Sequence, residues 1–277
     1  VACLQNCAGT DVQQNLRDLR VMIDSARADG ADLVCLPEYG TCLGVDGAEF
    51  VVGANVEESH PALVYLSDLA KETGVWILIG SMAVNAPGGK IVNRSLLLND
   101  LGDVVSRYDK IHLFDVDLAN GETYRESATI QPGDRAVVAD TPWGGIGLTV
   151  CYDVRFPQLY RSLARGGAGI ITVPAAFART TGEAHWHVLL RSRAIETGCF
   201  IVAPCQTGLH GTSESYGHSL IIDPWGKVLA DAGPDVGVVS ATLDLSQIEK
   251  CRSMVPALQH DRPYLEVEAG RSSQAAE

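Results

Sequence analysis

The sequence lacks the long apolar runs and leader patterns of membrane and exported proteins. No apolar run in its 277 residues approaches the roughly 18 residues that a membrane-spanning helix needs. No basic segment followed by an apolar one stands at the start, so no signal peptide is predicted. The chain begins inside the apolar run 1–4, which leaves open that a targeting segment has been removed.

Basic residues are few and dispersed. The chain has 21 lysines and arginines against 34 aspartates and glutamates, a net charge of −13. Nucleic-acid-binding proteins usually gather lysine and arginine into a stripe, so we expect no nucleic-acid partner. The acidic excess is typical of a solvated surface and does not indicate a substrate.

Cysteine is present eight times, but no two cysteines have the C-x-x-C spacing of zinc ribbons and thioredoxin-like sites. Several lie in apolar runs, among them Cys35 and Cys205, where cysteine behaves as a small hydrophobic residue. A chain of this length that is 46% hydrophobic needs no disulfides. We therefore predict a reducing, cytoplasmic compartment.

Strand and helix patterns alternate along the whole chain, without a linker, a repeat or a change in composition. Strands are expected at 1–5, 32–36, 75–84, 91–98, 104–108, 136–139, 147–150, 170–173, 200–203, 219–222 and 236–243, helices at 11–28, 62–72, 158–165, 183–196 and 247–254, and a polar loop at 114–134. This pattern predicts a single α/β domain over 1–265 with mixed sheets and helices outside. A polar tail follows at 266–277.

Cys151 stands at the end of an expected buried strand, just before the amphipathic stretch 158–165. Backbone N–H groups that follow such a junction are free to receive an anion, which suits a nucleophile that attacks a carbonyl. The polar residues Tyr152, Asp153 and Arg155 follow closely, which is unusual for a core cysteine. The other seven cysteines fit better as structural residues.

Two charged residues, Glu38 and Lys110, also follow expected strands, and a third, Glu126, lies in the expected polar loop. Glu38 comes after an apolar run, where a partly desolvated carboxylate would suit a general base. Taken alone, it fits better as a helix cap or a solvated loop residue. Lys110 could bind an oxyanion, although most lysines are surface charges. Glu126 carries a weaker signal still.

Three motifs together resemble the signatures of the nitrilase (carbon–nitrogen hydrolase) superfamily, and they occur in that family's order. They are LPE at 36–38, YDKIH at 108–112 and TVCYDVRFP at 149–157. YRESATIQPG at 124–133 resembles the loop with the family's second glutamate. The similarity continues through 180–186, 191–196 and 216–226, and so covers most of the chain.

The resemblance implies a four-layer α-β-β-α sandwich with mixed sheets and a Glu–Lys–Cys triad, without a cofactor or a metal ion. Glu38 would be the base, Lys110 would stabilise the transition state and Cys151 would be the nucleophile. Glu126 would position the lysine and the substrate, and the Tyr152 N–H would complete the oxyanion hole. Family members usually pair as dimers, so a homodimer or a higher homo-oligomer is expected.

The segments at 153–157, 182–186 and 214–220 look most like the branch of deaminated-glutathione amidases and omega-amidases. That branch cleaves a terminal carboxamide of a small carboxylate-bearing substrate to acid and ammonia through a cysteine thioester. Arg155 resembles the residue that binds the substrate carboxylate, but it could instead pair with Asp153. Phe177, Thr181 and His185 resemble pocket residues, although Phe177 could equally pack in the core.

Other interpretations stay open at this stage. His185 and His187 form an H-x-H pair, but helical spacing puts them on different faces and no third metal ligand stands nearby. His187 is therefore taken as ordinary, and His112 and His218 as satisfied structural histidines. Residues 205–214 depart from the better-known family members. Nitrile or N-carbamoyl amino acid hydrolysis remains an alternative, as does a non-catalytic binding or scaffold protein on the same fold.

Overall fold

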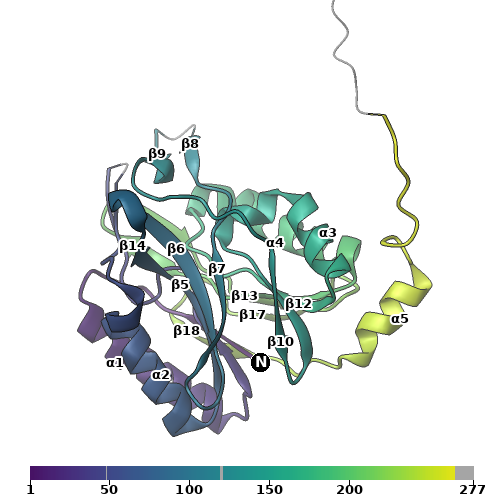
Figure 1. Ribbon diagram of the computed structural model, residues 1–277, viewed down its shortest axis with the longest axis horizontal. Helices are drawn as coiled ribbons and strands as arrows, with labels where there is room; N and C mark the ends of the chain where they lie inside the picture. Colours follow the sequence, from purple (N-terminus) through teal and green to yellow (C-terminus); the bar gives the residue numbers. More distant parts are fainter. Residues whose placement is uncertain (48, 119–120, 266–277) are drawn as a thin grey trace, which may run out of the picture.

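Two six-stranded mixed sheets lie at the centre of the structure, and helices cover their outer faces (Figure 1). The computed structural model describes residues 1–47, 49–118 and 121–265. The first sheet has the order β18 (Gly237–Ser240), β1 (Ala2–Gln5), β2 (Leu33–Cys35), β5 (Trp76–Asn85), β6 (Ile91–Leu98) and β7 (Val104–Asp109). The second has the order β10 (Val137–Thr141), β11 (Gly144–Leu148), β12 (Ala168–Thr172), β13 (Phe200–Ala203), β16 (Leu220–Ile222) and β17 (Val228–Asp231).

Side-chain alternation explains why the first sheet has helices on one face and the second sheet on the other. Leu33 and Cys35 of β2 belong to the core between the sheets, whereas Val34 packs toward the helices. Successive residues of a strand point to opposite faces, so a strand buried on both faces is apolar throughout. The predicted four-layer α-β-β-α sandwich is confirmed.

Two helices cover each sheet. The helices α1 (Val12–Ala28) and α2 (Pro61–Thr73) share a core with the first sheet, and α3 (Pro157–Arg165) and α4 (Arg179–Thr197) share one with the second. Local signals set the helix ends: Asp11 accepts a 3.1 Å hydrogen bond from the N–H of Gln14, and Gly74 ends α2 at φ +69°. The short helix α5 (Ser246–Met254) follows the last strand.

Several expected elements need correction. The polar loop expected at 114–134 contains the hairpin β8 (Asp115–Asp117) and β9 (Thr123–Arg125) and the 3₁₀ turn Glu126–Ala128. Residues 205–214 belong largely to an unpredicted hairpin of β14 (Thr207–His210) and β15 (Ser213–Tyr216). Another small hairpin joins β3 (Gly44–Asp46) and β4 (Glu49–Val51). Short polar strands were missed because they lack the apolar alternation that marks a half-buried strand.

Most expected strand ends differ from the observed ones by one to three residues, and one expected segment cannot be compared. The strand before Cys151 ends at Leu148 instead of residue 150, and the strand expected at 236–243 covers only Gly237–Ser240. The expected tail at 266–277 lies outside the described residues. Among the helices that the structure describes, none has the length and apolar character needed to cross a membrane.

Gly80 allows the chain to pass closely where the site begins. A Cβ atom at Gly80 would lie 2.0 Å from the carbonyl oxygen of Leu36 and 2.5 Å from that of Pro37. The pairing of β5 with β6 shifts register at this point, between Ile79 and Met82. A residue without a side chain is therefore required for β5 to pack against the segment that carries Glu38.

Candidate active site

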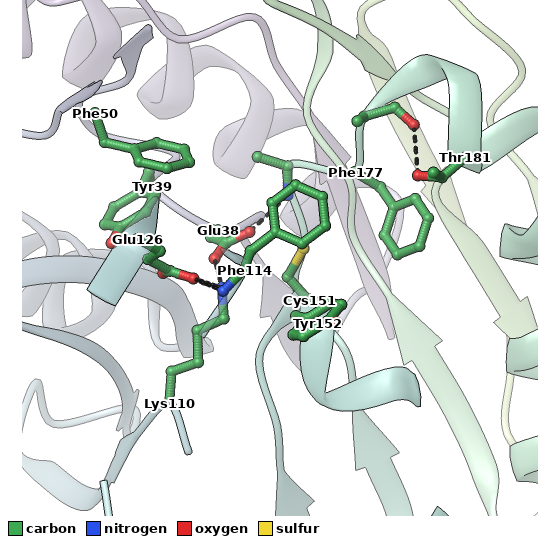
Figure 2. A pocket seen from close by; sticks show the side chains of 12 residues that line it. Glu38, Tyr39, Phe50, Lys110, Phe114, Glu126, Cys151, Tyr152, Phe177 and Thr181 are labelled. Carbon is green, nitrogen blue, oxygen red and sulfur yellow. Dashed lines mark hydrogen bonds and ion pairs between the residues drawn. The ribbon is translucent and has the colours of Figure 1, made fainter. Parts of the chain in front are cut away.

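The four residues expected to carry the chemistry meet in one pocket (Figure 2). Cys151, Glu38, Lys110 and Glu126 come from four separate segments, and each is at most 7% exposed. The other lining residues are Tyr39, Phe50, Phe114, Tyr152, Ala176, Phe177, Ala178 and Thr181. The structure thus brings together groups that lie up to 113 positions apart in the sequence.

Cys151 sits on a sharp turn three residues beyond the end of β11. Its φ of +47° lies in the left-handed region, which non-glycine residues seldom adopt and which is most often retained at functional positions. Its N–H donates a 2.8 Å hydrogen bond to the carbonyl of Pro174. A 3₁₀ turn begins at Cys151, so the N–H of Tyr152 belongs to a first turn, where helical acceptors are lacking.

Asp153 joins the Cys151 turn to the segment that carries Lys110. One carboxylate oxygen accepts hydrogen bonds from the Val150 N–H at 2.9 Å and the Tyr108 hydroxyl at 2.7 Å. The other lies 2.7 Å from the Nδ1 atom of His112. Because Asp153 is fully buried and has these partners, it holds two catalytic segments in register. The interpretation of His112 as a satisfied structural histidine is consistent with this contact.

Lys110 bridges the two glutamates. Its Nζ atom lies 3.0 Å from Oε1 of Glu38 and 3.0 and 2.9 Å from the two carboxylate oxygens of Glu126. The side-chain amide of Asn93 also donates to both glutamates, at 2.9 and 3.2 Å. Lys110 and Asn93 together fix the two carboxylates relative to each other.

Backbone donors complete the two carboxylates. The second oxygen of Glu38 accepts a 2.9 Å hydrogen bond from the Ala176 N–H, and Glu126 accepts one of 2.7 Å from the Phe114 N–H. Glu38 therefore lies against Lys110 on one side and the segment after β12 on the other. Buried carboxylates with such partners are held in one geometry.

Burial dominates the protonation of this cluster. It raises the pKa of the Cys151 thiol, and the nearby charge of Glu38 raises that pKa further, so the resting thiol is protonated near neutral pH. Burial also raises the pKa of Glu126, while Lys110 opposes this shift. Burial alone would lower the pKa of Lys110, but Glu126 and Glu38 outweigh it and raise that pKa. A cysteine that cannot ionise by itself needs an adjacent base.

The expected substrate-binding residues form one side of the pocket and its edge. Tyr152, Phe177 and Thr181 line the pocket directly. The guanidinium carbon of Arg155 lies 5.8 Å from the centre of the Tyr152 ring and 5.3 Å from that of Phe177. His185 does not line the pocket, but its Nδ1 atom lies 3.3 Å from Nη1 of Arg155.

Arg155 forms no ion pair with Asp153, which was the alternative interpretation of this residue. The partners of Asp153 are those given above, and within residues 1–47, 49–118 and 121–265 no carboxylate lies within ion-pair distance of Arg155. Its charge is therefore stabilised by two ring faces and a histidine instead of an anion.

Sequence analysis missed several residues of the site. Asn93 is fully buried in strand β6, and an amide inside this largely apolar segment was a signal that could have been noticed. Tyr39, Phe50 and Phe114 line the pocket, yet no local pattern marks them, because their roles depend on contacts between distant segments. The view of His187 as ordinary also needs correction, because it lies beside His218 and Asp231.

Comparison with known proteins gives consistent matches over most of the chain. The model of the family described as carbon-nitrogen hydrolase matches residues 1–253. The chain is 41% identical over 266 residues to the deaminated glutathione amidase of Yersinia enterocolitica, which covers 95% of this chain and 92% of that protein.

Solved structures with a similar fold also match most of the chain. The NitFhit protein of C. elegans superposes with a TM-score of 0.85 at 33% identity, covering 94% of this chain and 64% of that one, so this chain spans about two thirds of it. A mutant of the amidase from Nesterenkonia sp. AN1, with the acetamide moiety of fluoroacetamide covalently added at its active-site cysteine, superposes with a TM-score of 0.78. It is 25% identical and covers 94% of this chain and 93% of its own.

Proposed function

The chain belongs to the carbon–nitrogen hydrolase family, and we propose that it is an amidase that uses Cys151 to hydrolyse the terminal carboxamide of a small carboxylate-bearing substrate. Deaminated glutathione, which the name of the Yersinia relative gives as its substrate, is the first candidate. The observation that carries the proposal is the convergence of a protonated cysteine, two glutamates and a lysine in one pocket.

Glu38 is proposed to take the proton from Cys151 as the sulfur attacks the amide carbonyl. Cys151 and Glu38 line the same pocket, and Glu38 is close enough to raise the pKa of the thiol, so the proton has a short path. The carbonyl oxygen gains negative charge in the tetrahedral intermediate. Hydrogen bonds to Glu38 and Glu126 hold the ammonium group of Lys110 beside the reacting atoms. Its positive charge, together with the Tyr152 N–H, is placed to stabilise the negative charge on this oxygen.

Collapse of the intermediate breaks the C–N bond, and Glu38 returns its proton to the departing nitrogen, which leaves as ammonia. The acyl group remains on Cys151 as a thioester. Glu38 then takes a proton from water, the resulting hydroxide attacks the thioester, and the acid product leaves as the thiol is re-protonated. Glu126 keeps Lys110 in place throughout, because it holds the Nζ atom through both carboxylate oxygens.

The covalent adduct on the active-site cysteine of the Nesterenkonia amidase supports the role of Cys151. That protein shares the fold over 94% of this chain.

Arg155 is proposed to bind the carboxylate of the substrate. Its guanidinium lies against two rings that line the pocket and has no carboxylate partner among the described residues. A planar guanidinium can donate two parallel hydrogen bonds to a carboxylate. His185, beside Arg155, would restrict the arginine, and Phe177 and Thr181 would bound the substrate between Arg155 and Cys151.

Ammonia release measured over a panel of substrates tests this proposal. Deaminated glutathione and omega-amides of keto acids should be hydrolysed with a higher kcat/KM than neutral aliphatic amides, carbamoyl amino acids or nitriles. Arg155→Ala should lower kcat/KM for the acidic amides by about 1–3 kcal/mol, roughly 5- to 150-fold. Arg155→Lys keeps the charge but cannot donate two parallel hydrogen bonds to the carboxylate, so it should cause a smaller loss of kcat/KM.

Neutral amides serve as the internal control, and Arg135→Lys, on an exposed arginine, serves as the control variant. Both Arg155 variants should leave the neutral amides nearly unchanged. Equal losses for acidic and neutral amides would show that Arg155 supports the turn and does not select the substrate.

We also propose a homodimer in a reducing, cytoplasmic compartment. Val188 and Ile195 are exposed on α4, seven residues apart and therefore on one face. Ile195 lies beside Gly226, which follows the exposed Trp225. All eight cysteines are free thiols. Sedimentation should give a dimer for the native chain and a monomer for Ile195→Glu if this face is the interface.

A further inference from the structure

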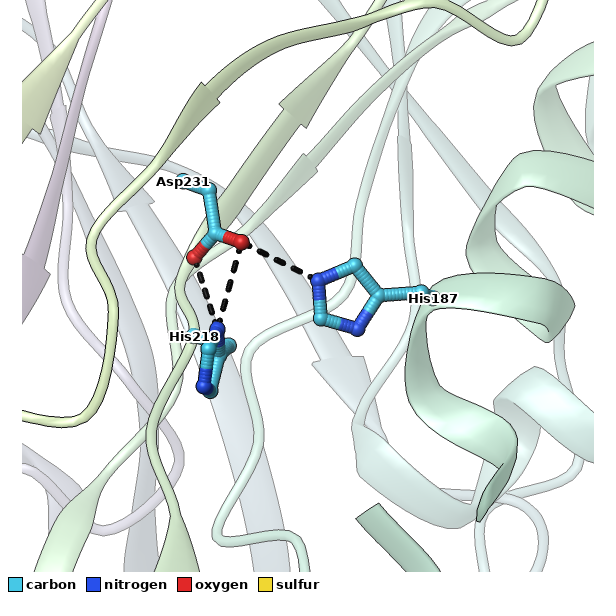
Figure 3. Close-up of side chains that lie close together, drawn as sticks. All are labelled: His187, His218 and Asp231. Carbon is cyan, nitrogen blue, oxygen red and sulfur yellow. Dashed lines mark hydrogen bonds and ion pairs between the residues drawn. The ribbon is translucent and has the colours of Figure 1, made fainter. Parts of the chain in front are cut away.

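Outside the pocket, three potential metal ligands from distant segments face one another on the surface (Figure 3). His187 comes from α4, His218 from the segment just before β16, and Asp231 from the end of β17. Nε2 of His187 lies 3.1 Å from Oδ2 of Asp231, and Nδ1 of His218 lies 2.9 and 3.2 Å from its two oxygens. The ligand atoms of all three residues lie within 4.8 Å of one another.

We propose that His187, His218 and Asp231 form a binding site for a late first-row divalent metal ion such as Zn²⁺ or Co²⁺. Two imidazoles and one carboxylate are a ligand set that these ions favour. Metal–ligand bonds of about 2.0–2.2 Å at a tetrahedral angle place ligand atoms about 3.4 Å apart. The two histidine–carboxylate separations are already close to this value, so an ion mainly has to draw the two rings together.

The surrounding structure orients these side chains as supporting groups do around metal sites. The Gly233 N–H donates a 2.9 Å hydrogen bond to Oδ1 of Asp231, and the N–H of His218 donates one of 2.7 Å to the Gly233 carbonyl. The ring of Tyr216 stacks on that of His218 at 4.5 Å. Such outer contacts fix ring orientation before the ion arrives.

His218 is also held in an unusual backbone conformation. Its φ is +53°, and among the described non-glycine residues only Tyr39 and Cys151 share a positive φ. Those two residues line the catalytic pocket. Retained backbone strain at a third place, with two metal-ligand side chains beside it, is consistent with a functional role there.

An ion can reach the site and would not have to displace a buried structure. The three side chains are between 25% and 34% exposed. Each neutral imidazole has two tautomers, so the nitrogen that now faces Asp231 can become a lone-pair donor. Three protein ligands leave at least one further position on the ion for water.

A bound ion would cross-link α4 to the second sheet close to the pocket. Trp186, adjacent to His187, donates from its indole N–H to the His218 carbonyl at 2.8 Å, and its ring lies 4.7 Å from that of Phe177. We therefore expect metal binding to raise the thermal stability of the folded chain. This inference does not depend on the proposed amidase function, and no step of the reaction passes through the ion.

Equilibrium dialysis of the full chain against Co²⁺, with absorption spectra of the bound ion, tests the site. Native protein should bind one Co²⁺ per chain without the sulfur-to-cobalt charge-transfer band that a cysteine ligand produces. His187→Gln and Asp231→Asn should each weaken binding at least about tenfold. His260→Gln, on an exposed histidine outside the cluster, should bind as the native chain does.

Co²⁺ should also raise the midpoint of thermal unfolding for the native chain and for His260→Gln, but not for the two ligand variants. Absence of binding would overturn the proposal. Binding that both ligand variants retain, or binding that shows the cysteine band, would overturn it as well, because the ion would then lie elsewhere.

Discussion

Replacing Lys110 by methionine should remove the only cation that contacts the two buried glutamates within the described part of the chain. Glu38, Glu126 and Lys110 are each at most 3% exposed, and both carboxylates lie within 3.0 Å of Nζ. Methionine has a similar volume but no charge. Two carboxylates would then be buried without compensation, which costs about 3–5 kcal/mol when one partner of a buried pair is removed.

The pH dependence of this loss has a definite sign. In the folded state, burial and the charge of Glu38 raise the pKa of Glu126, whereas Lys110 lowers it. Without Lys110, the pKa of Glu126 therefore rises further. A carboxyl group with a raised folded pKa binds its proton more tightly when folded, so it costs stability once the pH exceeds the unfolded value of about 4.3. Lys110→Met should therefore be most destabilising near pH 8 and less so near pH 5.

The double variant Lys110→Met/Glu126→Gln separates charge from catalysis. It leaves one buried carboxylate, Glu38, which keeps its hydrogen bonds from Asn93 and the Ala176 N–H. Measured by urea unfolding, the double variant should regain about half of the stability that Lys110→Met loses. Its kcat should stay about two to four orders of magnitude below the native value, because the oxyanion has lost its cation.

Lys227→Met, on an exposed lysine, is the control and should change stability by less than about 0.5 kcal/mol. Two results would refute the reasoning. One is a Lys110→Met variant as stable as the control, and the other is a double variant no more stable than the single one. A decrease in kcat of less than tenfold would refute the catalytic role of Lys110.

The remaining predictions concern the nucleophile, the base and alkaline stability. Cys151→Ala should abolish ammonia release and the thioester adduct seen by mass spectrometry, with unchanged circular dichroism; full activity would exclude this nucleophile. Glu38→Gln should lower kcat by roughly two to four orders of magnitude, and a change confined to KM would contradict its role as base. Burial raises the pKa of Cys35 and Cys205 to about 12, from about 9. Because the pKa values of these thiols are higher in the folded than in the unfolded chain, the protonated thiols contribute their full stability below pH 9. This contribution is lost as the pH rises above 9. Each thiol should cost about 1.4 kcal/mol by pH 10, measured by urea unfolding under reducing conditions, and the loss should shrink in Cys35→Ala/Cys205→Ala.

The sequence alone determined the architecture and the four central residues of the pocket. Apolar strands alternating with amphipathic helices predict an α/β fold, because each element must bury its apolar face. Glu38, Lys110, Cys151 and Glu126 were predicted because their motifs resemble those of the nitrilase superfamily and occur in that family's order. Signals of this kind are local, so they can be read before any contact between segments is known.

Only the tertiary structure decided how these residues work together. Asn93 lies 55 positions from Glu38 and 33 from Glu126, yet its amide bonds to both carboxylates. The choice between an ion pair and a free guanidinium at Arg155 depended on where Asp153 points.

The metal-ligand cluster shows the same limit of sequence reasoning. His187 stands next but one to His185 in the sequence, yet its partners are His218 and Asp231, 31 and 44 positions away. Polar contacts between distant segments leave no periodic trace in a sequence, since either partner alone resembles an ordinary surface residue. Burial of the apolar faces brings such residues together, so their chemistry becomes visible only in the folded chain.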